Sequence, residues 1–242
     1  MATVTEVERD AELRRLAARL LDRAWQGAAG YCVPNRRSYP HLWLWDSCFH
    51  VIAWAALGDR RAVEELQTVF AGQFAGGFLP HIRYRDGSIR HRHRGPLAGS
   101  SSFTQPPVYV RALLAVRDAG MEIPAELLDR AASALDALWR DRLRDGLLVV
   151  VHPWEAGTDD SPRWDSWVGS HRWRRRRWTA FDREIASRAV YGADGQAIDS
   201  TAFVVAPASF NAIAADAARC LGDLLDDDTW RRRAGDLADT LD

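Results

Sequence analysis

The stretch Gly77-Phe-Leu-Pro-His81 and its counterpart Gly146-Leu-Leu148, with His152-Pro153 just beyond it, decide the fold predicted for this chain. Each follows a predicted pair of helices, and the two lie roughly 70 residues apart. Repeated helix pairs whose loops share one edge are typical of an α-toroid, in which those loops converge on a central pocket. The sequence therefore predicts an all-α toroid.

The segments around these two stretches have helical periodicity. Apolar residues recur every three or four positions over residues 7–26, which predicts an amphipathic helix. Asp46 or Ser47 is the expected cap of an apolar helix that ends before Gly58, and Thr104 the expected cap of a helix opened by Pro106 and Pro107. Further helices are expected at about 60–73, 124–143, 182–190, 199–222 and 226–242, whereas the best strand candidate is 147–151.

The number of helices bears on domain organisation. A helical toroid closes with about a dozen helices, and this sequence predicts about eight. The last residues, Leu241-Asp242, fall inside an amphipathic pattern without a C-cap. Residues 1–242 are therefore expected to be the N-terminal portion of a single toroid domain, about eight of whose twelve helices are present.

Composition narrows the function classes. The formal net charge is −1, so no global field favours nucleic acid or an anionic membrane. Eleven tryptophans are many for 242 residues, and excess indole suggests stacking surfaces for flat apolar ligands. Cys32, Cys48 and Cys220 are odd in number and scattered, which fits a reducing compartment. With no leader-like or membrane-length apolar run, the predicted location is the cytoplasm.

No cofactor or metal motif stands out. The chain has no phosphate-binding glycine loop, and His91-Arg92-His93 lacks ligand partners at zinc spacing. The expected partner is a small sugar, with neither nucleic acid nor a membrane, and the sequence carries no signal for an oligomeric state.

The candidate catalytic loop is residues 152–165, which holds four carboxylates and two tryptophans between Gly and Pro residues. Indole faces stack on sugar C–H groups, and a carboxyl group beside them has a raised pKa, as a general acid requires. Asp159, near Trp154 and Trp164 and adjacent to Asp160, is the candidate general acid because both burial and like charge raise its pKa. The structural alternative is an Asx-type turn before a helix.

A second segment repeats the combination of tryptophan and carboxylate. In residues 39–50, Asp46 follows Trp43 and Trp45 and could accept hydrogen bonds from sugar hydroxyls, or simply cap a helix. Gln105 offers an amide to the same hydroxyls, although a single Gln at a helix start is more often structural. Arg183 could bind a carboxylate, or pair with Asp182 or Glu184 at the surface.

One segment points to a different function. In residues 171–178, arginines 172 and 174–177 alternate with tryptophans, a composition that suits single-stranded nucleic acid. A solvated flap over an active site explains the same pattern on a protein of nearly neutral charge.

These motifs resemble glycoside hydrolase family sixty-three and its relatives, most closely the bacterial mannosylglycerate and glucosylglycerate hydrolases. The resemblance rests on residues 39–50, Gly77–His81, Thr104–Pro107 and Trp154–Asp165, in that order along the chain. It implies an (α/α)6 barrel and an inverting glycosidase with Asp159 as general acid. It also implies a general base, a Glu in the C-terminal third of the family domain, that these 242 residues do not contain, so this chain alone is expected to be inactive.

The resemblance also implies the substrate-binding residues. Arg183 would hold the carboxylate of a glycerate aglycone. The expected sugar-binding residues are Tyr39, Trp43, Trp45, Asp46, His81, Gln105, Trp154, Glu155 and Trp164. Residues 85–103 lack the aromatic loop of the glycerate-specific relatives, so two alternatives stay open. One is a trehalase-like or debranching-type α-glucosidase acting on a neutral oligosaccharide, and the other is a non-catalytic helical protein that binds carbohydrate or nucleic acid.

Overall fold

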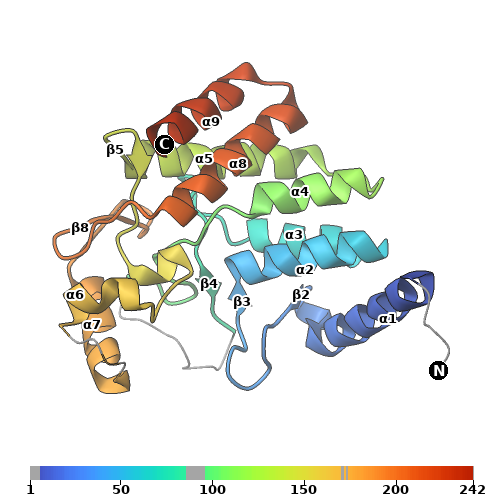
Figure 1. Ribbon diagram of the computed structural model, residues 1–242, viewed down its shortest axis with the longest axis horizontal. Helices are drawn as coiled ribbons and strands as arrows, with labels where there is room; N and C mark the ends of the chain where they lie inside the picture. The colour runs from blue at the N-terminus through green and yellow to red at the C-terminus, as the bar shows by residue number, and fades with distance from the viewer. Residues whose placement is uncertain (1–5, 86–95, 170–171, 173, 242) are drawn as a thin grey trace.

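The computed structural model describes residues 6–85, 96–169, 172 and 174–241. Within these ranges the chain is mainly helical, and eight short strands pair into four two-stranded antiparallel sheets (Figure 1). The α-helices are α1 (Glu6–Ala24), α2 (Leu44–Leu57), α3 (Arg61–Phe70), α4 (Tyr109–Asp118), α5 (Ala125–Arg142), α6 (Asp165–Val168), α7 (Arg175–Ser187), α8 (Ala208–Leu225) and α9 (Asp228–Leu241). The 3₁₀ helices are η1 (Gly27–Ala29), η2 (Pro153–Ala156) and η3 (Pro162–Trp164).

The strands lie in the connections between helices. They pair as β1 (Trp25–Gln26) with β2 (Tyr31–Cys32), β3 (Leu42–Trp43) with β4 (Ile82–Arg83), β5 (Leu143–Arg144) with β6 (Leu147–Leu148), and β7 (Ala189–Tyr191) with β8 (Ala197–Ser200). None of these described strands exceeds four residues, so the helices form the core and the strands shape the loops at its edge.

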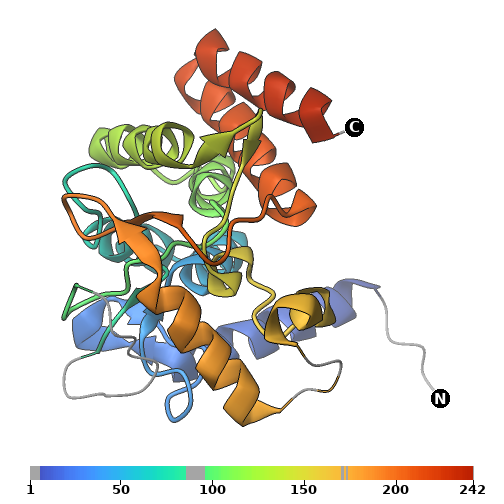
Figure 2. The same ribbon diagram turned by 90° about the vertical axis from the view of Figure 1, so that its left-hand side faces the viewer.

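The long helices form two rows. Helix α4 packs between α2 and α8, and each of these three is followed in the chain by a helix of the second row, α3, α5 or α9 (Figure 1). Helix α3 contacts α5, and α5 reaches α9 through the edge-to-face rings of Trp139 and Trp230. Helices α1 and α9 lie at opposite ends of the assembly in both views (Figures 1 and 2). The described helices thus form an open arc of helix pairs, as the sequence predicted.

The core lies between the two rows. Its largest buried side chains include Trp54 of α2, Phe70 of α3, Tyr109 of α4 and Phe210 of α8. Phe70 and Tyr109 pack edge to face, with ring centroids 5.7 Å apart. Burial of such rings contributes most of the stabilisation that holds the rows together.

Helix α2 begins earlier than the capping pattern suggested. Its N-cap is Trp43, and Asp46 lies in the first turn, where a carboxylate is stabilised by the helix dipole. The strand β3 runs directly into this helix, so backbone pairing with β4 sets the start of α2 in place of a side-chain cap. The C-terminal end agrees with the prediction, because Gly58 adopts a left-handed conformation with φ of 74°.

Helix α4 begins at Tyr109, so the expectation that Thr104 caps it was wrong. Two consecutive prolines, Pro106 and Pro107, disfavour helical geometry in the residues before them. The Thr104 backbone N–H is instead bound by Glu155.

The C-terminal third differs most from the prediction. The helix expected to start at 199 starts only after Pro207, because strand β8 of the β7–β8 hairpin extends to Ser200. Helix α7 begins at Arg175, so part of the arginine-rich segment expected to form a flap is helical, and arginines 172 and 174–177 are exposed. Residues 174–177 are all arginine, so this part of the segment has no alternation of apolar and polar residues from which a helix could be predicted.

Helix α1 buries only part of its apolar stripe. Leu21 is buried, but Leu13, Leu16 and Leu20 are 58%, 48% and 67% exposed. Among the described helices α1 packs mainly on α2, and this contact leaves Leu13, Leu16 and Leu20 exposed. In the described ranges no helix combines the length and the apolar character that crossing a membrane requires.

A buried ion pair joins the loops at one end of the arc. Arg142, at the end of α5, binds both oxygens of Glu155 in η2 at 2.7 and 2.8 Å, and both side chains are at most 1% exposed. Glu155 also accepts the backbone N–H groups of Thr104 and Val151, while Arg142 donates to the carbonyls of Val149 and Ala197. This corrects the prediction that Glu155 binds sugar, because its carboxylate is fully occupied inside the protein.

Replacing Glu155 by Gln should lower the free energy of unfolding by about 3–5 kcal/mol, because Arg142 would keep a buried charge without a counter-ion. Urea unfolding measures this change. The control is Glu126→Gln, whose partner Arg130 is at the surface and whose loss should cost about 1 kcal/mol or less. Equal effects of the two substitutions would contradict the assigned role.

Candidate active site

The first wall of the site comes from β3 and the start of α2. Strand β3 pairs with β4 so that Trp43 lies opposite Ile82, and the Leu44 N–H donates to the His81 carbonyl. The Trp43 ring packs edge to face between Tyr39 and His81, with centroids at 5.5 and 5.7 Å. This strand pair therefore helps to fix three aromatic side chains on one surface.

Gln105 connects this wall to the loop before α4. Its side-chain oxygen accepts the Trp45 backbone N–H at 3.1 Å. The hydrogen bond uses one lone pair of the amide oxygen, and the NH₂ group of the same amide is a donor. Gln105 thus has both the structural role and the position that the sequence left as alternatives.

The opposite wall is the acidic loop. The η2 turn ends at Gly157, whose φ of 66° is left-handed. A Cβ at this position would lie 2.2 Å from the Trp45 ring, so only glycine lets the loop approach the indole this closely. Beyond it, the Trp164 indole donates to the Thr158 carbonyl at 2.7 Å and supports the loop from behind.

Helix α7 closes the third side. Its Asp182 carbonyl lies 3.3 Å from the His152 ring nitrogen Nε2, which joins the helix to the acidic loop. The Asp182 side chain lines the cavity.

These walls enclose a cavity of about 370 Å³. It lies between the start of α2, the loop before α4, the acidic loop and α7. The volume is within the range of small-ligand sites. The lining residues are Pro34, Tyr39, Trp43, Trp45, Asp46, His81, Ile82, Gln105, Trp154, Gly157, Asp159 and Asp182.

Three of the lining residues are carboxylic acids with raised pKa values. Burial, the negative charge of Asp160 and that of Asp46 raise the pKa of Asp159 to about 7. Burial, Asp160 and Asp159 raise the pKa of Asp182 to about 7 as well. Burial also raises the pKa of Asp46, against the opposing effect of His50.

Asp159 combines this proton affinity with access to the cavity. The residue is exposed to solvent and also lines the cavity. A group that protonates a bound molecule needs both properties. The cavity therefore offers aromatic surfaces, an amide, and acids that hold protons near neutral pH.

Eight of the eleven expected site residues line this one cavity: Tyr39, Trp43, Trp45, Asp46, His81, Gln105, Trp154 and Asp159. This confirms the prediction that Tyr39, Trp45, Asp46, Gln105 and Asp159 converge. The other three do not line it. Glu155 is in the buried ion pair, Trp164 is buried behind the loop, and Arg183 is exposed on α7.

Asp182 is the main residue that sequence reasoning missed. It was considered only as an ion-pair partner of Arg183. A helix places consecutive residues about 100° apart, so if Asp182 faces the cavity, Arg183 turns away from it. The apolar neighbour Phe181 was the available signal, because a carboxylate beside a buried aromatic residue on a helix lies near the protein interior. The residues His91–His93, His171 and Trp173 lie outside the described ranges.

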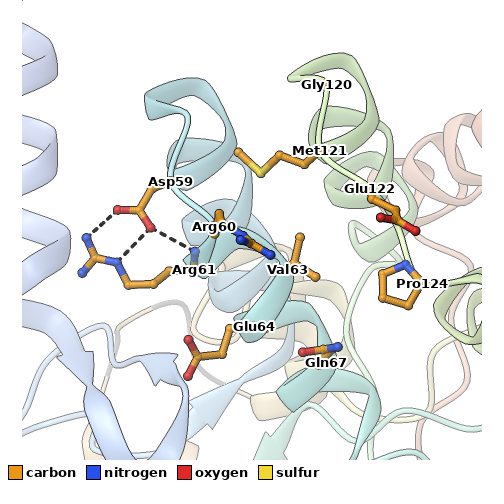
Figure 3. A pocket seen from close by; sticks show the side chains of 10 residues that line it. All are labelled: Asp59, Arg60, Arg61, Val63, Glu64, Gln67, Gly120, Met121, Glu122 and Pro124. Carbon is orange, nitrogen blue, oxygen red and sulfur yellow. Dashed lines mark hydrogen bonds and ion pairs between the residues drawn. The ribbon is translucent and has the colours of Figure 1, made fainter.

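A second, larger hollow lies at the other ends of the helices (Figure 3). It measures about 890 Å³ and lies between the α2–α3 and α4–α5 connections. Its walls carry Met121 and Val63 but no aromatic ring among the described lining residues, and Arg61 is already bound by Asp59 at 2.6 Å. Its described lining residues offer no aromatic stacking surface and no acid with a raised pKa, in contrast to the first cavity.

Comparison with known proteins agrees with the arrangement of helix pairs. A sequence model of the mannosylglycerate hydrolase MGH1-like glycoside hydrolase domain matches residues 39–242. The chain is 35% identical over 170 residues to a mannosylglycerate hydrolase of Rubrobacter radiotolerans, covering 62% of the chain and 38% of that protein. It is 34% identical over 155 residues to a glucosylglycerate hydrolase of Mycolicibacterium hassiacum, covering 53% of the chain and 34% of the relative.

Solved structures extend the comparison. A crystal structure of a GH63 mannosylglycerate hydrolase from Thermus thermophilus with Tris and D-glycerate matches at a TM-score of 0.70 and 27% identity, over 92% of this chain and 63% of that one. The same enzyme with glucose matches at a TM-score of 0.66 and 28% identity, over 92% and 61% of the two chains.

The fold is therefore that of the (α/α)6 glycoside hydrolases. The chain belongs to the family of mannosylglycerate hydrolase MGH1-like glycoside hydrolase domains. It spans about two fifths of the length of the curated relatives that it matches.

Replacing Asp159 by Asn should change the free energy of unfolding more favourably at pH 8 than at pH 5, compared with the unmodified protein at the same pH. The folded state holds the Asp159 proton up to about pH 7, whereas the unfolded chain releases it near 3.8, so ionisation lowers the free energy of unfolding as pH rises between these values. Asn does not ionise. Because the cavity is open to water, the relative gain should be about 1 kcal/mol.

Thermal unfolding at the two pH values measures this gain. The control is Asp129→Asn, which replaces an acid on α5 outside the cavity and should show no such pH dependence. A gain that is the same at both pH values would contradict a raised pKa for Asp159.

Proposed function

We propose that the protein containing this chain is a glycoside hydrolase that cleaves a small α-glycoside of glycerate, such as glucosylglycerate or mannosylglycerate, with inversion. The observation that carries the proposal is the convergence of Trp43, Trp45, Asp46 and Gln105 on the same cavity as Asp159. Family membership supports the reaction class, and the glycerate bound by a solved relative supports the aglycone.

Each residue has a role that its chemistry suits. Aromatic faces of Trp43, Trp45 and Trp154 pack on sugar C–H groups. Asp46 accepts hydrogen bonds from sugar hydroxyls and Gln105 donates to them. Asp159 stays protonated up to about pH 7 and transfers its proton to the departing glycosidic oxygen.

Inversion requires a second carboxylate that activates water on the opposite face of the sugar, about 6.5–9.5 Å from the acid. We propose that residues 1–242 are the N-terminal part of the domain and that a Glu outside them is this base. The share of the solved relative's length that the chain covers supports this assignment. The negative charges of Asp160 and Asp159 raise the pKa of Asp182. A general base must be ionised, so Asp182 suits this role less well than a carboxylate farther from Asp159.

The position of Arg183 favours a second candidate function. Because this residue is exposed and does not line the cavity, no described arginine holds a glycerate carboxylate there. An α-glucosidase of trehalase-like or debranching type, acting on a neutral oligosaccharide, needs no such arginine. The compartment proposed for either activity is the cytoplasm, because Cys32, Cys48 and Cys220 are buried free thiols.

The full-length protein should hydrolyse glucosylglycerate or mannosylglycerate in preference to trehalose and isomaltose. NMR of the first turnovers should show release of the β-anomer of the sugar, the signature of inversion at an α-glycoside. Asp159→Asn should lower kcat by about 10²–10⁴-fold. The 242-residue chain alone should show no turnover. Turnover by that chain near the full-length rate would place the base within these residues and contradict the mechanism.

The rate of hydrolysis should fall as pH rises through the pKa of Asp159, about 7. Asp160→Asn removes a negative charge that raises this pKa, so the alkaline limb of the kcat/KM profile should move to lower pH. Asp129→Asn, on α5 and outside the cavity, should leave the profile unchanged. A shift of the limb to higher pH in Asp160→Asn would contradict the assignment of Asp159 as the acid.

A further inference from the structure

A cluster of metal-ligating side chains lies next to the cavity, and none of its three residues lines it. Cys32 of β2, His50 of α2 and Glu65 of α3 each present one ligand atom, and these atoms all lie within 4.8 Å of one another. Cys32 and Glu65 are fully buried, and the His50 side chain is 18% exposed. The mechanism proposed above uses none of the three.

We propose that Cys32, His50 and Glu65 form a binding site for one zinc ion, which ties β2 and α3 to the helix that carries Trp45 and Asp46. The inference does not depend on the proposed hydrolase activity, because it concerns different side chains.

The separation of the nitrogen and oxygen ligand atoms suits zinc. The His50 Nδ1 atom lies 3.2 Å from Oε1 of Glu65. Tetrahedral zinc with nitrogen and oxygen ligands at about 2.0–2.2 Å holds those two atoms about 3.3 Å apart. A sulfur, a nitrogen and an oxygen ligand form a mixed set that zinc accepts, whereas calcium and magnesium prefer oxygen alone. Three protein ligands leave a fourth position for water.

The bonding of Glu65 points to a missing partner. Its Oε1 accepts the Cys32 backbone N–H at 3.0 Å and faces His50, but its Oε2 is buried with no hydrogen-bond partner among the described residues. A buried carboxylate oxygen without a partner is costly, and an ion or a water is the usual explanation. The nearby Arg61 guanidinium does not supply the partner, because it stacks on Trp54 and binds Asp59 and Asp22.

Charge balance allows zinc to replace a proton at this site. With zinc bound, the two positive charges are matched by the Glu65 carboxylate and a Cys32 thiolate, and His50 is neutral. Burial raises the pKa of the Cys32 thiol well above its usual range, so this thiol loses its proton only when the metal binds. Zinc binding at this site therefore releases protons, and its affinity rises with pH.

The test is a titration of the chelator-treated protein with Co²⁺, a spectroscopic substitute for zinc. A thiolate-to-cobalt charge-transfer band should appear, saturate at one ion per chain, and disappear on addition of Zn²⁺. Zn²⁺ should also raise the thermal unfolding temperature. Cys32→Ser and Glu65→Gln should each abolish the band. Cys220→Ser, which alters a buried free thiol on α8, should retain it.

Circular dichroism of each variant establishes that it is folded, and the unmodified protein provides a result that needs no variant. If the unmodified protein shows no band and no thermal shift, the proposal is overturned, and the cluster is a His50–Glu65 ion pair alone. A band that persists in Cys32→Ser, or that is lost in Cys220→Ser, would also overturn it.

Discussion

The buried ion pair between Arg142 and Glu155 is the constraint on which the site depends. It is bidentate, fully enclosed, and bonded to backbone groups of other segments, including Thr104 and Ala197. A bidentate pair has fixed geometry, so it adds directional restraint to the apolar packing of Phe103, Val151 and Ala197 in the same loops. Thr104 is adjacent to Gln105 and Glu155 to Trp154, and both neighbours line the cavity. A single interaction inside the protein thus sets two walls of the candidate site.

The remaining walls follow from close backbone approaches. Gly157 lets the acidic loop lie against Trp45, and the β3–β4 strand pair holds Trp43 on the opposite side. These contacts surround the Asp159 carboxyl group with protein and with the charges of Asp160 and Asp46, which together raise its pKa. The same packing that shapes the cavity therefore raises the pKa of Asp159, as the proposed role of general acid requires.

The sequence predicted the helical toroid and most of the cavity because these features depend on local patterns. Paired tryptophans and carboxylates at loop–helix boundaries identified Trp45, Asp46 and Asp159, and Gly58 marked the end of α2 correctly. Features that depend on contacts between distant segments were not predictable. Glu155 resembled a sugar ligand because its partner Arg142 lies in another element. Asp182 was missed because its place in the cavity depends on how α7 packs against the acidic loop. The β7–β8 hairpin depends on pairing with register shifts that no local pattern encodes.

The central claim is that Asp159 is an acid whose surroundings hold its proton near neutral pH. Carbon-13 NMR titration of aspartate-labelled protein measures this directly, with the Asp159→Asn variant identifying the resonance. The account predicts a midpoint near pH 7 for the Asp159 carboxyl carbon. A midpoint close to about 4, the value of an unperturbed aspartate, would contradict it.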